Sequence, residues 1–196
     1  MLIHRKSLAG VTLIELMIAI AIVGILLVTG LPEAVNWIQN TKIRSSAESI
    51  SNGLQLARAE AVRRNTQVEF VLTNSLPTAA NVPALALSTS GPYWVVRIFQ
   101  AGAYTAADFI QGGGNEVTTS SAVISTSPAD ANVVFNGLGR TDLAAGAWTI
   151  QVTNPNGGAC VAASGPMRCL NVRVQPGGQI RMCDPSILTA GDTRKC

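Results

Sequence analysis

The chain has 196 residues, which is enough for one helix and one globular head. Charged residues make up 13% of it, against about 25% in an average soluble domain, and the formal net charge is only +3. No strong basic field therefore points to nucleic acid as the partner, and the composition predicts a neutral, polar head surface.

The chain begins with a long apolar run that contains a single ionisable side chain. From Leu8 to Leu31 this side chain is Glu15. About 20 apolar residues suffice for a helix to cross a bilayer, whereas a cleaved secretory signal has an apolar core of about 7 to 15 residues. An acidic residue near the centre of a span costs about 2.5–3.5 kcal/mol. The sequence therefore predicts a membrane-spanning helix over residues 11–31 in which Glu15 has a partner; the alternative is an ordinary signal anchor.

The residues around this run resemble the leader of type IV pilins and pseudopilins. The resemblance rests on H-R-K at positions 4–6, on Gly10, and on T-L-I-E-L at positions 12–16. It implies that residues 1–10 are a class III leader peptide and that a prepilin peptidase cuts between Gly10 and Val11. It also implies that Val11 is then methylated, although the family usually has phenylalanine at this position.

The resemblance to type IV pilins implies a specific role for Glu15. It becomes the fifth residue of the mature chain, where it would pair with the ammonium group at Val11 of a neighbouring subunit. Two paired ions cost far less in a bilayer than one ion alone. Glu15 is therefore predicted to act in assembly and not in catalysis. The implied partners are other pilin or pseudopilin subunits, the prepilin peptidase and the inner-membrane assembly machinery.

The helical pattern continues beyond the apolar run, over residues 32–65. Its apolar positions recur at steps of three and four residues, which is typical of one buried stripe. These positions are Ile43, Ala47, Ile50, Leu54, Ala57 and Ala61. On the solvent side, Glu60 is spaced to pair with Arg63 and Arg64. We expect this segment to carry the helix into the head.

After residue 65 the apolar period changes to two, which is typical of strands. Pro176 to Gly178 are expected to form the turn of a C-terminal hairpin. The section from Ser75 to Asp130, apart from the predicted strand Tyr93–Phe99, is interpreted as long surface loops. These loops include the glycine run 112–114, which is expected to be flexible. The predicted strands are Val68–Leu72, Tyr93–Phe99, Val133–Phe135, Trp148–Val152, Leu170–Val174 and Ile180–Met182.

The expected fold class is α+β with a type IV pilin-like architecture. A long N-terminal helix, with a membrane-spanning first half, packs on a mainly antiparallel β-sheet head over residues 66–196. Within the pilins, the segments 54–65 and 133–140 and the closing hairpin resemble the GspH, FimT and FimU group of minor subunits. The resemblance implies a role in type IV pilus assembly, in the tip or initiation complex, with the head in the periplasm. The alternatives are a type II secretion pseudopilin and a DNA-binding minor pilin for natural transformation.

The four cysteines all lie in the last 37 residues, on the exported side of the predicted anchor. Disulfides are the expected state there, because the periplasm is oxidising. Four cysteines allow three pairings, and short loops favour Cys160 with Cys169 and Cys183 with Cys196. A zinc site is the rival interpretation, but no C-x-x-C pair supplies the usual ligand spacing. The bridges are expected to be structural.

No catalytic, metal or cofactor site is predicted. The only histidine is His4, in the leader, so the mature chain has no imidazole for a triad. Some FimT-like members bind DNA through a glycine-arginine-x-arginine motif, whose first arginine is replaced here by Gln179. The remaining cations would form a modest phosphate patch, or they simply solvate an exposed strand and tail, which is the favoured interpretation. They are Arg181, Arg173, Arg194 and Lys195.

Overall fold

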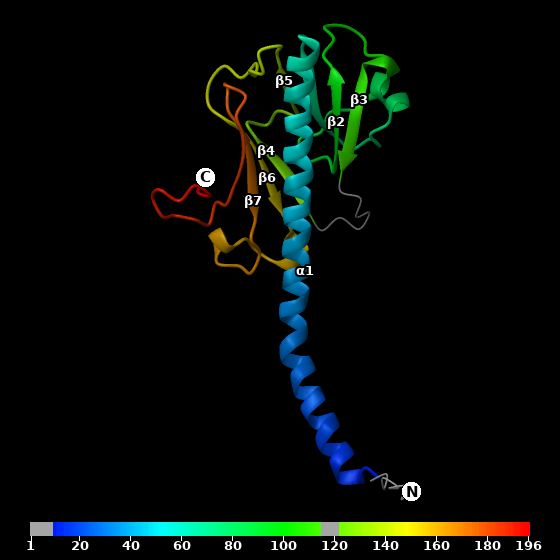
Figure 1. The fold of residues 1–196 in the computed structure, drawn as a ribbon, viewed down its shortest axis with the longest axis vertical. Helices are drawn as coiled ribbons and strands as arrows, with labels where there is room; N and C mark the ends of the chain where they lie inside the picture. Colours follow the sequence, from blue (N-terminus) through cyan, green and yellow to red (C-terminus); the bar gives the residue numbers. More distant parts are fainter. Residues whose placement is uncertain (1–9, 115–121) are drawn as a thin grey trace, which may run out of the picture. The chain divides into compact units, whose positions relative to one another are not determined.

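A computed structural model describes residues 10–114 and 122–196, apart from the side chains of residues 28–32 and 155. The predicted leader, except for Gly10, lies outside these residues. The chain divides into an N-terminal unit, residues 1–37, and a head unit, residues 38–196. One helix, α1 (Leu13–Arg64), contributes its first part to the N-terminal unit and its second part to the head (Figure 1).

The head part of α1 buries the apolar stripe that the sequence predicted. All six stripe residues, from Ile43 to Ala61, are at most 2% exposed. The helix ends where Asn65 adopts a left-handed backbone conformation, with φ of 49°. The N–H of Thr66 then donates to the carbonyl oxygen of Ala61 at 3.2 Å, which satisfies one of the last carbonyls. Asparagine tolerates this conformation better than most residues.

Two antiparallel four-stranded sheets form the rest of the head, where a mainly antiparallel sheet was expected. The first has the order β3-β2-β1-β5 and the second the order β4-β6-β7-β8. In Figure 1, β2 and β3 lie on one side of α1, and β4, β6 and β7 on the other. The strands are β1 (Val68–Thr73), β2 (Tyr93–Ile98), β3 (Phe109–Gly114), β4 (Val123–Ser127), β5 (Asn132–Phe135), β6 (Trp148–Thr153), β7 (Leu170–Val174) and β8 (Ile180–Cys183). Short 3-10 helices are η1 (Ala79–Ala84), η2 (Ala106–Asp108), η3 (Pro155–Gly157) and η4 (Val161–Ala163).

The six predicted strands are confirmed, but the interpretation of residues 75–130 as loops is wrong at β3 and β4. The glycine run 112–114 is the end of β3 and not a flexible loop. Glycine is needed there because a Cβ at Gly113 would come within 2.5 Å of the Trp94 ring. Glycines and alternating serines give these strands little apolar signal, which is why their sequences resemble loops.

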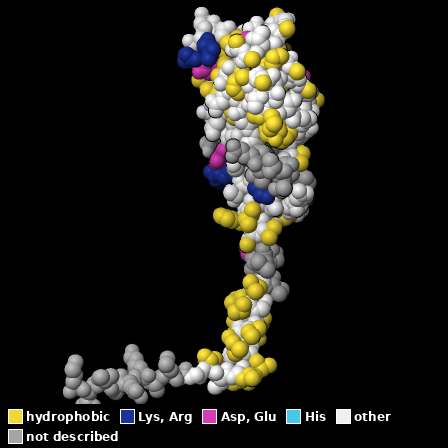
Figure 2. All heavy atoms as spheres, turned by 90° about the vertical axis from the view of Figure 1, so that its right-hand side faces the viewer, with side chains coloured by type: hydrophobic (Ala, Val, Ile, Leu, Met, Phe, Trp, Pro, Cys, Tyr) yellow, Lys and Arg dark blue, Asp and Glu magenta, His cyan; other side chains and the backbone are white. Residues whose placement is uncertain are grey.

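The core lies between α1 and the two sheets. Its largest members are aromatic: Phe70 stacks on Trp94 with ring centroids 5.9 Å apart and meets Trp148 edge-on at 6.2 Å. Gly53 lets the helix approach, since a Cβ there would lie 2.9 Å from both the Phe70 and the Trp94 rings. The visible face of the head in Figure 2 carries few charged side chains, in line with the neutral, polar surface that the composition predicted.

Glu60 gives the helix end a pH-dependent contribution to stability. Its carboxylate accepts hydrogen bonds from Arg63 and Arg64, each with one contact of 2.6 Å, and these bonds lower its pKa from 4.5 to about 2. Because the folded pKa is depressed, the stabilisation is fully present above about pH 4.5 and is lost as pH falls through about 2.

We expect Glu60→Gln to lower the free energy of unfolding by about 1 kcal/mol at neutral pH, a modest value because the two arginines are exposed. The difference from the wild type should vanish below about pH 2. Thermal unfolding of both proteins across this pH range tests the expectation. A stability difference that is independent of pH would contradict the assignment to these ion pairs.

Candidate functional site

The start of α1 is organised by Thr12. Its hydroxyl oxygen accepts a hydrogen bond from the backbone N–H of Glu15 at 3.3 Å, and its carbonyl oxygen accepts from the N–H of Leu16 at 3.2 Å. Thr12 therefore caps the helix, and the T-x-x-E spacing is the sequence signal that would have revealed it. Glu15 lies in the first turn, where a negative charge interacts favourably with the helix dipole.

The predicted cleavage site lies immediately before this cap. Gly10 and Val11 precede the helix and are exposed, with 74% of Val11 accessible. A Cβ at Gly10 would meet no atom within 4 Å. The peptide bond between these residues is therefore accessible to an enzyme, and cleavage and methylation there stay predictions.

The Glu15 side chain is exposed and available for a partner. Among the residues that the structure describes, no hydrogen bond or ion pair to its carboxylate is seen. The neighbouring side chains of this unit are apolar and mostly more than half exposed, as at Leu13, Ile14 and Met17. The Glu15 carboxylate therefore lies on an exposed apolar helix surface, and its pairing with another subunit stays a prediction.

Within residues 10–114 and 122–196, no helix reaches the combined length and apolarity that a membrane crossing requires.

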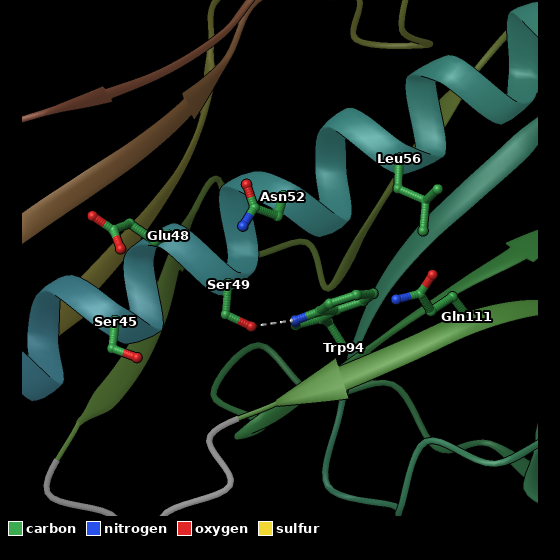
Figure 3. A pocket seen from close by; sticks show the side chains of 7 residues that line it. All are labelled: Ser45, Glu48, Ser49, Asn52, Leu56, Trp94 and Gln111. Atoms are coloured by element: carbon green, nitrogen blue, oxygen red, sulfur yellow. Dashed lines mark hydrogen bonds between the residues drawn. The ribbon is translucent and has the colours of Figure 1, made fainter.

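A polar groove runs along the head part of α1, between the helix and the β2–β3 end of the first sheet (Figure 3). Its volume is about 540 Å³. Trp94 forms its floor and donates from Nε1 to the Ser49 hydroxyl oxygen at 3.1 Å. The Glu48 carboxylate at its rim accepts from Arg44 at 2.8 Å. The lining residues are Ser45, Glu48, Ser49, Asn52, Leu56, Trp94 and Gln111. Among these residues, the Glu48 carboxylate is engaged by Arg44 and the Ser49 hydroxyl by Trp94, and no sequence pattern predicted the groove.

The cations that were considered for DNA binding gather around the C-terminal segment. Arg173 on β7 and Arg181 on β8 are direct cross-strand partners. Arg173 Nη1 donates to a main-chain oxygen of Cys196 at 2.6 Å, and Arg181 Nη2 donates to the carbonyl oxygen of Lys195 at 2.9 Å. Arg194 pairs with Asp192 at 2.8 Å and holds the pKa of that carboxyl near 2. Each of the three guanidinium groups therefore already has an acceptor from the chain itself.

Lys195 is the fourth cation, and its Nζ donates to the carbonyl oxygen of Leu188 at 3.1 Å. Arg173, Arg181 and Lys195 thus all donate to main-chain oxygens of residues 188–196. Binding of phosphates by these cations stays a prediction.

Both predicted disulfides are present. Cys160 bridges to Cys169 with a Cα separation of 5.5 Å, and Cys183 bridges to Cys196 with 5.1 Å. The second bridge fixes the tail against β8, where the Asp184 N–H also donates to the carbonyl oxygen of Arg194 at 2.7 Å. All four thiols are oxidised, so none of them serves a zinc site.

We expect the double variant Cys183→Ser/Cys196→Ser to lose about 3 kcal/mol of stability, or roughly 6–12 °C in Tm, because the chain-entropy model assigns such a value to a loop of this length. Hydrogen exchange should accelerate in residues 184–196 and not elsewhere. The matched variant Cys160→Ser/Cys169→Ser should lose a similar free energy but leave the tail protected. Equal protection of the tail in both variants would show that the second bridge does not hold it.

A buried ionic cluster on the outer face of the first sheet was not foreseen. Glu69 and Arg97, only 2% and 3% exposed, form an ion pair of 2.8 Å between β1 and β2. The Glu69 carboxylate also accepts from Tyr104 at 2.9 Å and from Asn132 at 2.6 Å. Burial and the hydrogen bond to Glu69 raise the pKa of Tyr104, whose ring lies 3.5 Å from the Arg97 guanidinium carbon. The cluster is covered and fully paired, so it is structural.

Comparisons with known proteins agree with the fold and with the N-terminal site. The sequence matches the family described as type II transport protein GspH over residues 46–178, and the prokaryotic N-terminal methylation motif over residues 5–31. No curated protein sequence gives a significant match.

Three solved structures are similar to this chain. Two are crystal forms of the type IV minor pilin FimU from Pseudomonas aeruginosa, with TM-scores of 0.54 and 0.50 and identities of 14% and 15%. They cover 74% and 71% of this chain, and 91% and 90% of FimU. The third is the minor pseudopilin EpsH of the Vibrio cholerae type 2 secretion system, with a TM-score of 0.47 and 10% identity, over 74% of this chain and 99% of EpsH. With its family match, its methylation motif and its helix packed on antiparallel sheets, the chain belongs to the GspH family of minor pilins and pseudopilins and has a type IV pilin-like fold.

Proposed function

We propose that this chain is a minor pilin that is cleaved by prepilin peptidase between Gly10 and Val11 and takes part in type IV pilus assembly, in the tip or initiation complex. Residues 11–31 anchor it in the inner membrane before assembly, with the head in the periplasm. Its work is to hold subunits together and not to catalyse a reaction. Its partners are other pilin subunits, the peptidase and the assembly machinery of the inner membrane.

One observation carries the proposal. Glu15 lies exposed in the first helical turn, close behind an accessible Gly10–Val11 bond, within a matched N-terminal methylation motif. A carboxylate that follows a new N-terminal ammonium at this spacing suits pairing between subunits, because each ion neutralises the other away from water. The resemblance of the fold to FimU supports the choice of a pilus subunit.

A second candidate is a pseudopilin of type II secretion, which the match to the type II transport protein GspH family favours. One deletion strain separates the two. Loss of surface pili and of twitching motility, with normal secretion, would support the pilus role. Intact pili with exoenzymes retained in the periplasm would instead support the secretion role.

DNA binding through Arg173, Arg181, Arg194 and Lys195 stays the third hypothesis. The two cross-strand arginines favour it, and the tail carbonyls that occupy their donors oppose it. It predicts that the protein retards DNA at low salt, that retardation falls steeply with salt, and that Arg181→Ala removes it. Absence of retardation at low salt would eliminate the hypothesis.

A further inference from the structure

The turn after β5, residues 136–140, is held in one conformation by its own hydrogen bonds. The side-chain oxygen of Asn136 accepts from the N–H groups of Leu138, at 3.0 Å, and Arg140, at 3.1 Å. The N–H of Asn136 donates to the carbonyl oxygen of Arg140, and that of Gly139 to the carbonyl oxygen of Asn136, both at 2.8 Å. One asparagine side chain thus fixes the backbone on both sides of the turn.

The turn is also clamped between two other parts of the head. Arg58 of α1 donates from Nε to the carbonyl oxygen of Gly139 at 3.2 Å. Gly139 itself has a φ of +71°, and a Cβ there would lie 3.2 Å from Val62. On the opposite side, a Cβ at Gly178 would collide with the Gly139 carbonyl oxygen, so the β7–β8 turn packs directly on it. Contact from both sides leaves the turn little freedom to move.

This fixed turn exposes a leucine to solvent. Leu138 is 80% exposed, and Val62 next to Gly139 is 52% exposed. The turn itself does not require a leucine, since its geometry depends on Asn136 and Gly139. An apolar side chain contributes to stability only where it leaves water, so Leu138 contributes almost nothing to the fold of this chain. A side chain that is already fixed loses little conformational freedom on binding, which favours a role in contact with another molecule.

Two arginines without carboxylate partners flank these apolar side chains. Among the described residues, Arg58 and Arg140 form no ion pair, and both are exposed. Glu60, the acidic residue of the same helix end, is occupied by Arg63 and Arg64. We call the group of Arg58, Val62, Leu138 and Arg140 the Leu138 patch. It combines an apolar centre with two guanidinium groups that have no carboxylate partner among the described residues, so its complement is an apolar socket that carries carboxylates at its rim.

A second copy of this chain fits this description poorly. Its groove along α1 has an apolar floor of Leu56 and Trp94, but the carboxylate at its rim, Glu48, already accepts from Arg44. This groove of a second copy therefore offers no carboxylate without a partner, and we assign the acidic rim to a different subunit.

We propose that the Leu138 patch is a docking surface for the head of a different pilin subunit, one that presents an apolar socket rimmed by carboxylates. Leu138 and Val62 enter the socket, and Arg58 and Arg140 pair with its acidic rim. The proposal rests on the pilin function proposed above and adds to it the place of contact and the chemistry of the partner surface.

The test places a photo-crosslinking residue at Val62, which leaves Leu138 intact, in cells that assemble the filament. The expected result is a covalent adduct with a different pilin subunit, mapped to a peptide that contains Asp or Glu. Leu138→Ser should reduce the adduct about tenfold or more, as truncation of an interface anchor does. Leu188 is an equally exposed leucine, at 81%, so a crosslinker there and the variant Leu188→Ser are the matched controls.

Arg140→Glu should also reduce the adduct, and Arg140→Lys should retain most of it. Thermal unfolding should show that Leu138→Ser keeps its stability, because the side chain is exposed. Any one of three results would overturn the proposal. The adduct yield could be no higher than from position 188, the adduct could form with a second copy of this chain, or Leu138→Ser could give the normal yield. In that case a deletion strain without pili would still support the pilin function, so the two failures can be distinguished.

Discussion

Glu69→Ala is expected to destabilise the head by about 3–5 kcal/mol, because it removes one partner of a buried ion pair and leaves the other charge uncompensated. Arg97 is 3% exposed, and its Nε donates to Glu69 at 2.8 Å. The same substitution deprives Tyr104 and Asn132 of their acceptor. Urea denaturation followed by tryptophan fluorescence would measure the loss as a lower midpoint.

The double variant Glu69→Leu/Arg97→Met is the matched control. It removes both charges, and well-packed apolar replacements of a buried ion pair are often neutral or even stabilising. We therefore expect the double variant to recover most of the stability that the single variant loses. A double variant as unstable as Glu69→Ala would assign the loss to Tyr104 and Asn132, which lack their acceptor in both variants, and not to the uncompensated charge of Arg97. A single loss below about 1 kcal/mol would contradict the expected cost of an uncompensated buried charge.

This cluster shows what sequence patterning leaves out. Alternation along V-E-F-V-L-T places Phe70 on the α1 side of β1 and Glu69 on the other, and a sheet with one wet face would leave Glu69 exposed. Instead β1 is buried on both faces. The partners of Glu69 lie 28, 35 and 63 residues away, on segments that reach this face only through tertiary packing. No local period encodes such a meeting.

The features that could be predicted are those whose sequence pattern lies within a single helix, strand or short loop. The stripe of α1 follows from a helical period within a single element, and the strand Leu170–Val174 from strict alternation. The pairing of the cysteines follows from short loops, which are the least costly to close. By contrast, β3 was missed because its glycines are set by the ring of Trp94 and by Pro77, which are contacts from other elements.

At the candidate site, the resemblance identified the residues, and the structure added their physical setting. Gly10, Val11 and Glu15 were found from a leader motif, and the structure adds that the Thr12 hydroxyl caps the helix by accepting from the backbone N–H of Glu15. The cap uses the N–H of Glu15 and leaves its carboxylate unused. Helix initiation and the proposed subunit pairing therefore involve different atoms of the same residue, and they can be tested separately.

Glu15→Gln is expected to reduce incorporation of the chain into filaments by about 100-fold while cleavage after Gly10 stays normal. The Thr12 cap accepts from the backbone N–H of Glu15, so the variant keeps the start of α1. It loses the negative charge, and the ammonium of the neighbouring Val11 then stays unpaired in the membrane. An unpaired charge there costs about 2.5–3.5 kcal/mol, which corresponds to about 100-fold in an equilibrium. The ratio of sheared filament to membrane-bound chain measures incorporation, and mass spectrometry of the N-terminus measures cleavage.

Two matched variants separate charge from other effects. Glu33→Gln removes an exposed carboxylate from the same helix, outside the predicted span, and should leave incorporation unchanged. Thr12→Ala removes the cap but keeps the charge, and should cost about 1 kcal/mol of helix stability, with only a small effect on incorporation. If Glu15→Gln enters filaments as well as Glu33→Gln does, the ammonium has another partner. If Thr12→Ala reduces incorporation as much as Glu15→Gln does, then assembly requires the capped first turn of α1. The carboxylate of Glu15 would then matter less than the conformation of this turn.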